Sequence, residues 1–416
     1  MTKTRARRRA KQVRLILVLS VILIALIGVA MFAFNGENAG WNTKGGVTRY
    51  LDDNGKPLTG WQQIEGNNYY FHTNGGAMAT GWTTIDGAKY YFTDSGSLTT
   101  GWTTYDGGRY YLGDDGAMTT GWKVLDGKNY YFDQNGRAAT GTLELDGKSY
   151  RFNEDGSVLT GWYDDATGRY FYNEDGTLAT GWLQWEQKTY YLGETGAMTT
   201  GWLTLGEDKY YFLPSGRMAI GQVEVDGINR FFSSKGKEVL MCNPWNAIPD
   251  DFQLDMVDYE GFQFDRETKA YLEQMFSDGR AQGAALEVNN SYRSIETQQY
   301  KWDKKVAERM AQGMTKEEAE RITGQSLAIP GHSEHHTGMA MDINSGGGAY
   351  EWMAEHCWDY GFIVRYPDNH LDVTGIIYEP WHFRYVGLEL SQELKGYCCI
   401  EHYFQQLTEQ QQAIAD

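Results

Sequence analysis

Two short stretches near the carboxyl end of the chain carry the residue types of a metal-dependent hydrolase. The first reads GHSEHHTGMAMD over residues 331–342, and the second reads YEPWHFRY over residues 378–385. A catalytic zinc ion takes three protein ligands with nitrogen or oxygen donors and keeps a fourth position open for water. We therefore expect one zinc ion, held by His335, Asp342 and His382.

Glu379 is left outside this ligand set as a candidate general base. Its carboxylate would take a proton from the water that zinc makes acidic, and a peptide bond is the natural target of such a nucleophile. Pro380 disfavours a helix at Glu379, so helical spacing cannot place Glu379 and His382 on one face. Scattered histidines also occur as hydrogen-bonded core residues, and the bare spacing leaves that interpretation open.

The surrounding motifs resemble the VanY-type D-alanyl-D-alanine carboxypeptidase family. That family carries a Y-R-S, an S-x-H-x(6)-D and an E-P-W-H stretch, and all three occur here in the same order, from Tyr292 to His382. The resemblance covers about residues 243–403. It implies that His335, Asp342 and His382 are the zinc ligands and that Glu379 is the general base.

The resemblance also implies a role for Arg293, which matches the arginine that stabilises the oxyanion of the tetrahedral intermediate. A fixed guanidinium that faces developing negative charge in a dry pocket lowers the barrier selectively. The alternative for Arg293 is an ordinary surface ion pair. Ser333, Gln298 and Tyr292 match family positions near the bound peptide and are expected substrate contacts. Trp381 either walls the pocket or packs in the core.

Two positions depart from the family pattern. Asn290 stands where a small hydroxyl residue is common, and His336 stands where an amide is usual. We expect neither side chain to touch a metal ligand. Adjacent histidines cannot easily reach the same ion, so we expect His335 to bind the metal, and His332 to be structural.

The residues around these motifs indicate a separate α+β domain over residues 243–405, followed by a tail at 406–416. Helical patterns occur in 270–276 and 297–313, and weak apolar alternation occurs around 285–292 and near 375–385. Strands at the last two places would flank the site.

A different pattern fills residues 40–240, where glycine recurs with a period of twenty and one step of twenty-one. Trp follows the glycine in each unit except at Thr142 and Gln222. In the unit that starts at Gly81, a short strand meets Asp86-Gly87 and then the run Lys89 to Phe92. Asp-Gly supplies the positive φ values of a tight hairpin turn, so each unit is a predicted β-hairpin.

Stacked hairpins can bury their aromatic residues on one another, which predicts an all-β solenoid with most rings in its interior. The units resemble the cell-wall-binding repeats of choline-binding proteins, glucan-binding enzymes and clostridial toxins. In the choline-binding form a Trp precedes the Tyr-Tyr pair and closes a cage by cation–π attraction. Here that position holds residues such as Lys89 and Arg109, which disfavours choline and favours wall glycan. The candidate wall-binding residues are Trp82, Tyr90, Trp102, Tyr110, Trp122, Trp182 and Trp202.

The amino-terminal residues indicate a membrane anchor. A basic segment, residues 1–14, precedes twenty uncharged and mostly aliphatic residues at 15–34, which is long enough to span a bilayer. A cleaved signal peptide is the alternative. Leaving out the seven basic residues of 1–14 lowers the net charge from -18 to -25, which argues against a nucleic-acid partner. We expect one N-terminal span and an extracellular remainder in a bacterial cell wall.

Four cysteines lie at or beyond the end of the repeats: Cys242, Cys357, Cys398 and Cys399. An exported location permits a disulfide from Cys242 to one of the adjacent pair, and free thiols are equally compatible with the spacing.

Together these features predict a zinc-dependent D,D-carboxypeptidase that removes terminal D-alanine from peptidoglycan stem peptides, targeted to the wall by its repeats. One alternative keeps the zinc site but changes the cut, to an L,D-carboxypeptidase or a peptidoglycan endopeptidase. The other is a wall-binding surface protein without catalysis.

Overall fold

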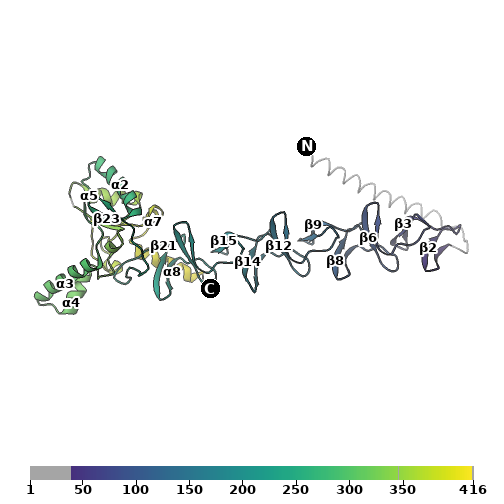
Figure 1. Cartoon of the computed structure of the whole chain (residues 1–416), viewed down its shortest axis with the longest axis horizontal. Coiled ribbons are helices and arrows are strands. Elements are labelled where there is room, and N and C mark those ends of the chain that lie inside the picture. The colour runs from purple at the N-terminus through teal and green to yellow at the C-terminus, as the bar shows by residue number, and fades with distance from the viewer. Residues whose placement is uncertain (1–38, 345, 415–416) are drawn as a thin grey trace. The chain divides into compact units, whose positions relative to one another are not determined.

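A computed structural model describes residues 39–344 and 346–414 (Figure 1). The described residues up to Tyr163, with Phe171–Leu178, form one compact unit, and Asp164–Tyr170 with the residues from Ala179 onward form another. The basic segment 1–14 and the anchor expected at 15–34 lie outside the described residues. Within the described chain, no helix combines the length and the apolar character that a bilayer crossing requires.

Ten hairpins make up the repeats, as the glycine period predicts. The first joins β1 (Gly40–Lys44) to β2 (Val47–Leu51), and the last joins β19 (Gly221–Val225) to β20 (Ile228–Phe232), which also pairs with β21 (Glu238–Val239). The strands between them are β3 (Gly60–Ile64), β4 (Asn67–Phe71), β5 (Gly81–Ile85), β6 (Ala88–Phe92), β7 (Gly101–Tyr105), β8 (Gly108–Leu112), β9 (Gly121–Leu125), β10 (Lys128–Phe132), β11 (Gly141–Leu145), β12 (Lys148–Phe152), β13 (Gly161–Asp165), β14 (Gly168–Tyr172), β15 (Gly181–Trp185), β16 (Lys188–Leu192), β17 (Gly201–Leu205) and β18 (Asp208–Phe212).

In six of the ten hairpins, an acidic residue followed by glycine forms the turn at the tip. In the hairpin of β5 and β6, Asp86 and Gly87 have φ values of 50° and 85°. Two successive positive φ values match the right-handed twist of the flanking strands, which is why Asp-Gly is favoured there. The register places Trp82 opposite Tyr91. The predicted hairpins are thus confirmed.

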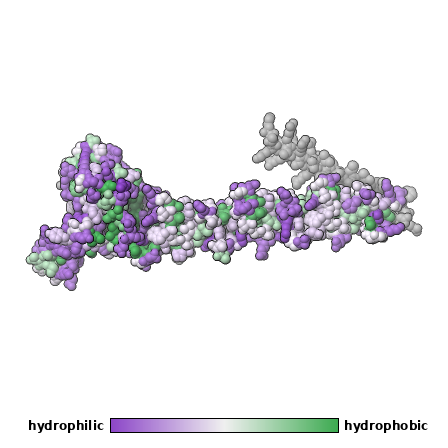
Figure 2. Space-filling model, in the orientation of Figure 1, coloured by the Kyte–Doolittle hydropathy of each residue, from purple (hydrophilic) through white to green (hydrophobic). Residues whose placement is uncertain are grey.

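Aromatic stacking between successive hairpins forms the interior of the repeats. The ring of Trp61 lies 5.0 Å from that of Tyr90 and 5.8 Å from that of Phe92, both in the next hairpin. Phe92 is completely buried. A lone hairpin is marginal in water, so these contacts supply the stability that each unit lacks alone. The visible face of the hairpins carries mainly polar and intermediate residues with small apolar patches between them (Figure 2).

The carboxy-terminal domain is built around a four-stranded antiparallel sheet with the strand order β24-β25-β27-β26. Its strands are β24 (Val288–Asn290), β25 (Ala340–Ile343), β26 (Phe362–Val364) and β27 (His382–Tyr385), with a separate hairpin of β22 (Met256–Tyr259) and β23 (Phe262–Asp265). Its helices are α2 (Arg266–Ala281), α3 (Ile295–Ala311), α4 (Lys316–Gly324), α5 (Ala349–His356), α6 (Leu371–Thr374), α7 (Leu388–Leu394), α8 (Ile400–Ala413) and the 3-10 helices η1 (Glu334–Thr337) and η2 (Cys357–Tyr360). The predicted α+β class and both predicted helices are confirmed.

The hydrophobic core lies on one face of this sheet, and the side chains of two metal-ligand candidates lie on the other. Met341, Ile343 and Phe383 point to one face and join a buried cluster with side chains of α2 and α5. Successive side chains on a strand point to opposite faces, so Asp342 and His382 point away from that core. The packing that stabilises the sheet therefore fixes the direction of both polar side chains.

The last hairpin is joined to the carboxy-terminal domain by helix α8. The backbone N–H groups of Ile220 and Gln222 donate to the side chains of Gln411 and Thr408, at 2.6 and 2.8 Å. The ring of Phe231 packs edge-on against that of Phe404, 5.2 Å away. The tail expected from residue 406 is instead the second half of α8, which ends at Ala413, because its apolar side chains are buried against the hairpin.

All four cysteines are free thiols in the structure. Cys242, Cys357 and Cys399 are buried, and burial raises the pKa of each to about 12. Buried thiols of raised pKa are poor nucleophiles, so the structure favours the interpretation of these residues as packing groups.

Candidate active site

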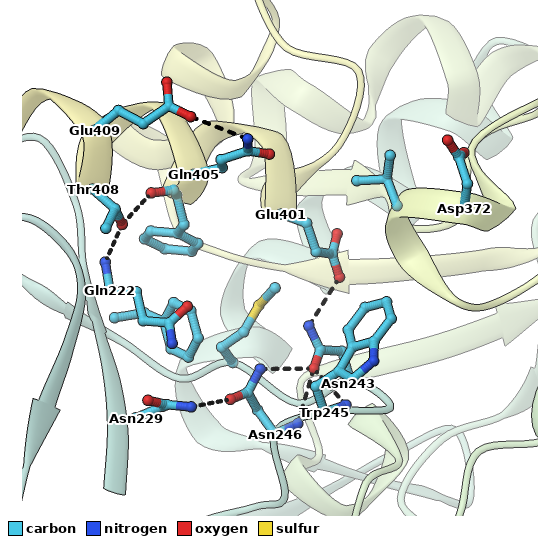
Figure 3. A pocket seen from close by; sticks show the side chains of 14 residues that line it. Gln222, Asn229, Asn243, Trp245, Asn246, Asp372, Glu401, Gln405, Thr408 and Glu409 are labelled. Carbon is cyan, nitrogen blue, oxygen red and sulfur yellow. Dashed lines mark hydrogen bonds between the residues drawn. The ribbon is translucent and has the colours of Figure 1, made fainter.

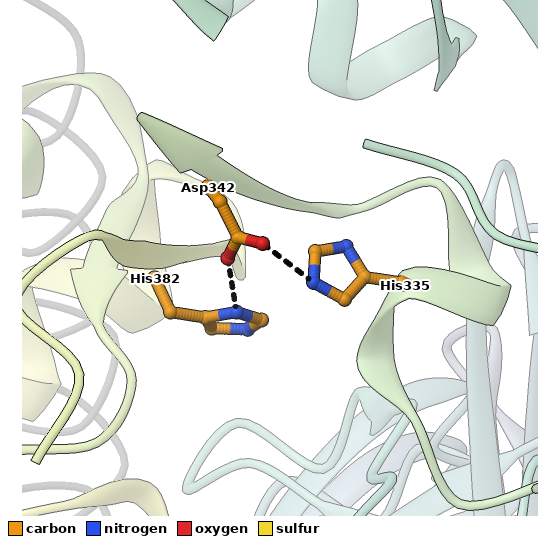
Figure 4. A group of neighbouring side chains, drawn as sticks. All are labelled: His335, Asp342 and His382. Atoms are coloured by element: carbon orange, nitrogen blue, oxygen red, sulfur yellow. Dashed lines mark hydrogen bonds and ion pairs between the residues drawn. The ribbon is translucent and has the colours of Figure 1, made fainter. Parts of the chain in front are cut away.

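His335, Asp342 and His382 converge on one point, although they come from three different elements. His335 lies in η1, Asp342 in β25 and His382 in β27. One donor atom from each side chain lies within 4.8 Å of the other two, and Figure 4 shows the three side chains turned toward one another. The predicted convergence of these residues is present in the fold.

A backbone hydrogen bond fixes the orientation of His335. Its Nδ1 lies 2.7 Å from the carbonyl oxygen of Ser291. A carbonyl only accepts, so Nδ1 carries the proton and Nε2 keeps its lone pair. That Nε2 lies 3.3 Å from Oδ2 of Asp342. The hydrogen bond thus selects the tautomer that can bind a metal through Nε2.

His382 is held from both sides of its ring. Its Nδ1 lies 2.9 Å from Oδ1 of Asp342, and its Nε2 lies 3.4 Å from a carboxylate oxygen of Glu334. Burial alone would lower the pKa of His382, but these two carboxylates outweigh burial and raise it to about 9. Burial alone would raise the pKa of Asp342, and hydrogen bonds from the two histidines lower it instead.

The donor set fits a zinc ion. It offers two imidazole nitrogens and one carboxylate oxygen, which is a combination that catalytic zinc uses. The side chains of His335, Asp342 and His382 are 6%, 15% and 4% exposed, so the donors are shielded yet reachable. Each histidine also has an outer hydrogen-bond partner, as metal-binding histidines generally do.

Glu379 lies beside these residues without belonging to the donor set. It is in the loop that leads into β27, where its N–H donates to the carbonyl of Tyr366 at 3.1 Å. One of its carboxylate oxygens lies 3.9 Å from Nδ1 of His382. Burial, aided by the charge of Asp342, raises the pKa of Glu379 to about 7. A carboxylate with this pKa can both accept and return a proton near neutral pH.

Arg293 is a half-buried guanidinium whose bonding capacity is only partly used. Its Nη1 donates to Oε1 of Gln298 at 2.7 Å, and its backbone N–H donates to the carbonyl of His335 at 3.0 Å. Its Nε is buried and has no partner among the described residues. No described carboxylate lies within ion-pair distance of Arg293, so the surface ion pair considered above is absent.

Gln298 supports the side chain of Arg293. Its side chain is completely buried, its Oε1 accepts from Arg293, and its Nε2 donates to the carbonyl of Ala328. Substrate contact by Gln298 stays a prediction, and the structure shows this side chain in a supporting position. Its effect is to hold the guanidinium in one orientation.

Ser333, Tyr292 and Trp381 lie on the segments that carry the site. Ser333 is buried at the start of η1, while Tyr292 and Trp381 are half-buried next to Arg293 and His382 in the chain. Their side chains make no hydrogen bond to another described residue. Substrate contact by these three residues stays a prediction.

Asn290 differs from the expectation drawn from the sequence. Its Nδ2 donates to Oδ2 of Asp342 at 2.9 Å and lies 3.4 Å from Nε2 of His335. The prediction that Asn290 touches no ligand is wrong, because strand β24 pairs with β25 and places Asn290 directly opposite Asp342. Its amide orients the carboxylate from outside the donor set.

The side chains of His336 and His332 form hydrogen bonds with backbone groups, as expected for structural histidines. Nδ1 of His336 lies 2.6 Å from the carbonyl oxygen of Arg293, and its Nε2 accepts from the N–H of Gly331 at 3.2 Å. Both ring nitrogens are thus used. Nδ1 of His332 lies 2.9 Å from the carbonyl oxygen of Asn243.

A buried ionic network behind the site was not predicted from the sequence. Arg365 is completely buried and pairs with Glu334 and with Glu401 of α8, each at 2.6 Å. Burial alone would raise the pKa of Glu334, but Arg365 and His382 lower it to about 2. Glu334 therefore stays ionised between a cation and a metal-ligand candidate. Its place beside His335 in the motif was a signal, but its partner lies thirty-one residues away.

The aromatic candidates in the repeats divide by exposure. Trp122, Trp182 and Trp202 are 46%, 47% and 42% exposed. The others, Trp82, Tyr90, Trp102 and Tyr110, are half-buried. The guanidinium of Arg109 lies 4.2 Å from the centre of the Trp102 ring, so a cation of the chain itself already occupies that face.

Comparison with known families agrees with both halves of the chain. Residues 261–388 match the family VanY, D-alanyl-D-alanine carboxypeptidase. Residues 39–80, 79–120 and 119–160 match a choline-binding repeat, and residues 180–198 and 200–218 match a cell wall binding repeat. The predicted resemblance of both parts is confirmed.

Individual relatives cover the same two regions. A D-alanyl-D-alanine carboxypeptidase of Enterococcus faecalis is 36% identical over 174 residues, which are 40% of this chain and 65% of the relative. The chain thus spans slightly less than two thirds of that relative. A crystal structure of a mutant vancomycin-resistance D,D-pentapeptidase VanY in complex with Zn(II) is 37% identical, covers 39% of this chain and 96% of its own, and has a TM-score of 0.37. Choline-binding protein F of Streptococcus pneumoniae is 24% identical, covers 53% of this chain and 97% of its own, and has a TM-score of 0.34.

Proposed function

Because the chain carries a VanY-type D-alanyl-D-alanine carboxypeptidase domain behind cell-wall-binding repeats, we propose that it is a zinc-dependent D,D-carboxypeptidase of the bacterial cell wall. Its substrate is the stem peptide of peptidoglycan, from which it hydrolyses the terminal D-alanine. The observation that carries the proposal is the convergence of His335, Asp342 and His382 within 4.8 Å. Glu379 and Arg293 lie around the same point, and we assign each of them a role in the reaction with a bound substrate.

The donor set, His335 Nε2, Asp342 and His382 Nδ1, would hold the metal. Bound zinc supplies Lewis acidity that activates water and polarises the scissile carbonyl. Glu379 takes the proton from the attacking water, since its raised pKa of about 7 makes it a stronger base than an exposed carboxylate. The same group then returns the proton to the departing amine of D-alanine.

Arg293 stabilises the negative charge that develops on the carbonyl oxygen during attack. Its Nη2 makes no hydrogen bond to a described residue and, unlike Nε, is not buried, so it can donate to that oxygen without first losing another hydrogen bond. Gln298 fixes the orientation of the guanidinium, because its Oε1 accepts a hydrogen bond from Nη1. A donor that is already oriented needs no reorganisation when the charge appears, which is why such groups contribute strongly to catalysis.

The repeats keep the enzyme near its substrate, by binding wall glycan on their exposed rings. Choline is disfavoured because cations of the chain, such as Arg109 over Trp102, occupy positions near these rings. Residues 15–34 anchor the protein in the membrane with the remainder outside. Tethering raises the local concentration of substrate without changing the active site itself.

Incubation of the purified, zinc-loaded protein with pentapeptide, tetrapeptide and cross-linked muropeptides tests the proposal, with products identified by mass. The proposal predicts loss of one alanine from the pentapeptide and none from the other two. Loss of alanine from the tetrapeptide would identify an L,D-carboxypeptidase, and opening of the cross-link an endopeptidase. No product from any substrate would favour a wall-binding protein without catalysis.

A further inference from the structure

A cavity of about 510 Å³ lies where the last hairpin meets the carboxy-terminal domain, away from the three metal-ligand candidates. Strands β19 and β20 form one wall, α8 forms a second, and the turn at residues 243–246 with α6 forms the third (Figure 3). Its volume is within the range of about 300–1,000 Å³ that small-ligand sites occupy. All of these walls belong to one compact unit.

The lining combines side-chain amides with a single exposed indole. Gln222, Asn229, Asn246 and Gln405 bring amides from three separate segments, and Trp245 is 59% exposed at the rim. An amide both donates and accepts, and an indole face offers an apolar platform with no charge. These are the groups that match the alternating hydroxyls and C–H faces of a sugar ring.

The charges around the cavity argue against an anionic ligand. No Lys, Arg or His is among the described residues that line it, so an anion finds no counter-charge. Glu401 is already neutralised by Arg365 at 2.6 Å and also accepts from Nδ2 of Asn243 at 3.2 Å. Glu409 accepts from Gln405 at 3.1 Å. Asp372 adds an exposed carboxylate to the lining. Carboxylates accept hydrogen bonds from hydroxyl groups, so the lining disfavours an anion and fits a polar ligand that is rich in hydroxyls.

Several hydrogen-bonding groups of the lining remain free. The side-chain amide of Gln222 and the indole N–H of Trp245 make no hydrogen bond to another described residue, and in Figure 3 both side chains border the open centre. By contrast, the amides of Asn229, Asn246 and Asn243 bond to one another in a row, at 3.2 and 2.8 Å. This row of amides fixes the donors and acceptors on one side of the cavity. The unbonded groups of Gln222 and Trp245 are left to face a ligand.

We propose that this cavity binds a neutral saccharide, the glycan strand that carries the stem peptide, through Trp245 and Gln222. The saccharide class follows from the lining, and the choice of wall glycan rests on the proposed function. The cavity shares its wall with the metal-binding segment, since the carbonyl of Asn243 bonds to His332 and the N–H of Ile248 donates to the carbonyl of Gly331. A strand held there delivers its peptide to the same compact unit that cleaves it.

Calorimetric titration of the full chain with the tetrasaccharide of N-acetylglucosamine and with maltotetraose tests the proposal. We expect Trp245→Ala and Gln222→Ala each to weaken tetrasaccharide binding about tenfold. Tyr300→Ala, a control that changes a 69% exposed aromatic residue of α3 outside the repeats and the cavity, should not reproduce that loss. Unchanged affinity in both cavity variants, an equal loss in the control, or no binding by the native protein would overturn the site. Tighter binding of maltotetraose would keep the saccharide site and reject wall glycan as its ligand.

Hydrolysis separates this proposal from the proposed function. On a short acylated D-Ala-D-Ala peptide without glycan, the cavity variants should release D-alanine at the native rate. On glycan-linked pentapeptide their KM should rise with kcat unchanged, and an unchanged KM would contradict the inference. If the native protein cleaves neither substrate but the titration results hold, the proposed function fails and the saccharide site stands.

Discussion

Asp342 and His382 face each other across strands β25 and β27, although forty residues separate them in the chain. The distance between Oδ1 of Asp342 and Nδ1 of His382 is 2.9 Å. The register that places them together is fixed by the apolar neighbours Met341 and Phe383, which are completely buried on the opposite face. A slip of one residue would turn both polar side chains into the core, so packing specifies the site.

Replacement of His382 by alanine should remove most of the bound zinc. Two donors remain in His382→Ala, and two ligands hold zinc far more weakly than three. Zinc content of the purified protein, measured by atomic emission, checks this. His370→Ala is the matched control, because His370 lies in a surface segment where its Nδ1 is 2.6 Å from the carbonyl oxygen of Asp368. Full zinc occupancy in His382→Ala would rule out this ligand.

Glu379→Gln should keep zinc and lose turnover. The change removes the proton acceptor while His335, Asp342 and His382 are untouched, so kcat should fall by about 10²–10⁴-fold or more. Zinc analysis and D-alanine release on the same preparation separate the two effects. Native activity in this variant would refute the general-base role.

Arg293→Lys should bind zinc normally and lose about 10²–10³ in kcat, as expected when an oxyanion donor is misplaced. Lysine keeps the charge but lacks the rigid fork of donors with which the guanidinium bonds Gln298 through Nη1 and faces the substrate oxygen with another N–H. Gln298→Leu should show a smaller loss of kcat, because its amide acts only through the guanidinium. If Gln298→Leu lost more activity than Arg293→Lys, this order of roles would be wrong.

Glu334→Ala should destabilise the carboxy-terminal domain by about 3–5 kcal/mol, because Arg365 would be left buried with one partner fewer. Asp359→Ala is the matched comparison, since it breaks the exposed pair of Lys395 and Asp359 and should cost about 0–1 kcal/mol. Denaturant unfolding of both variants checks the difference. Equal stability of the two proteins would contradict the structural role of the buried pair.

The sequence allowed the hairpins to be predicted in detail, because their information is local. Asp86 and Gly87 determine a turn by their own backbone preferences, and six of the ten units carry an acidic residue and glycine at that place. The stacking of Trp61 on Tyr90 follows from the same period. For these elements no long-range contact had to be known.

The three metal-ligand candidates were predicted from motifs, whereas their supporting contacts depend on strand pairing. Asn290 reaches Asp342 only because β24 pairs with β25, and Arg365 reaches Glu334 across the domain. Spacing in the chain carries no signal for either contact. The second half of α8 was missed for a similar reason, since its apolar residues, such as Leu407, are buried against a hairpin far away in sequence.

Anomalous diffraction at the zinc edge, from crystals of the full chain, tests the central claim most directly. The account predicts one strong peak in the carboxy-terminal domain, at about 2.0–2.2 Å from Nε2 of His335, a carboxylate oxygen of Asp342 and Nδ1 of His382. A peak bound elsewhere, or a zinc-soaked crystal with no peak between these three side chains, would contradict it.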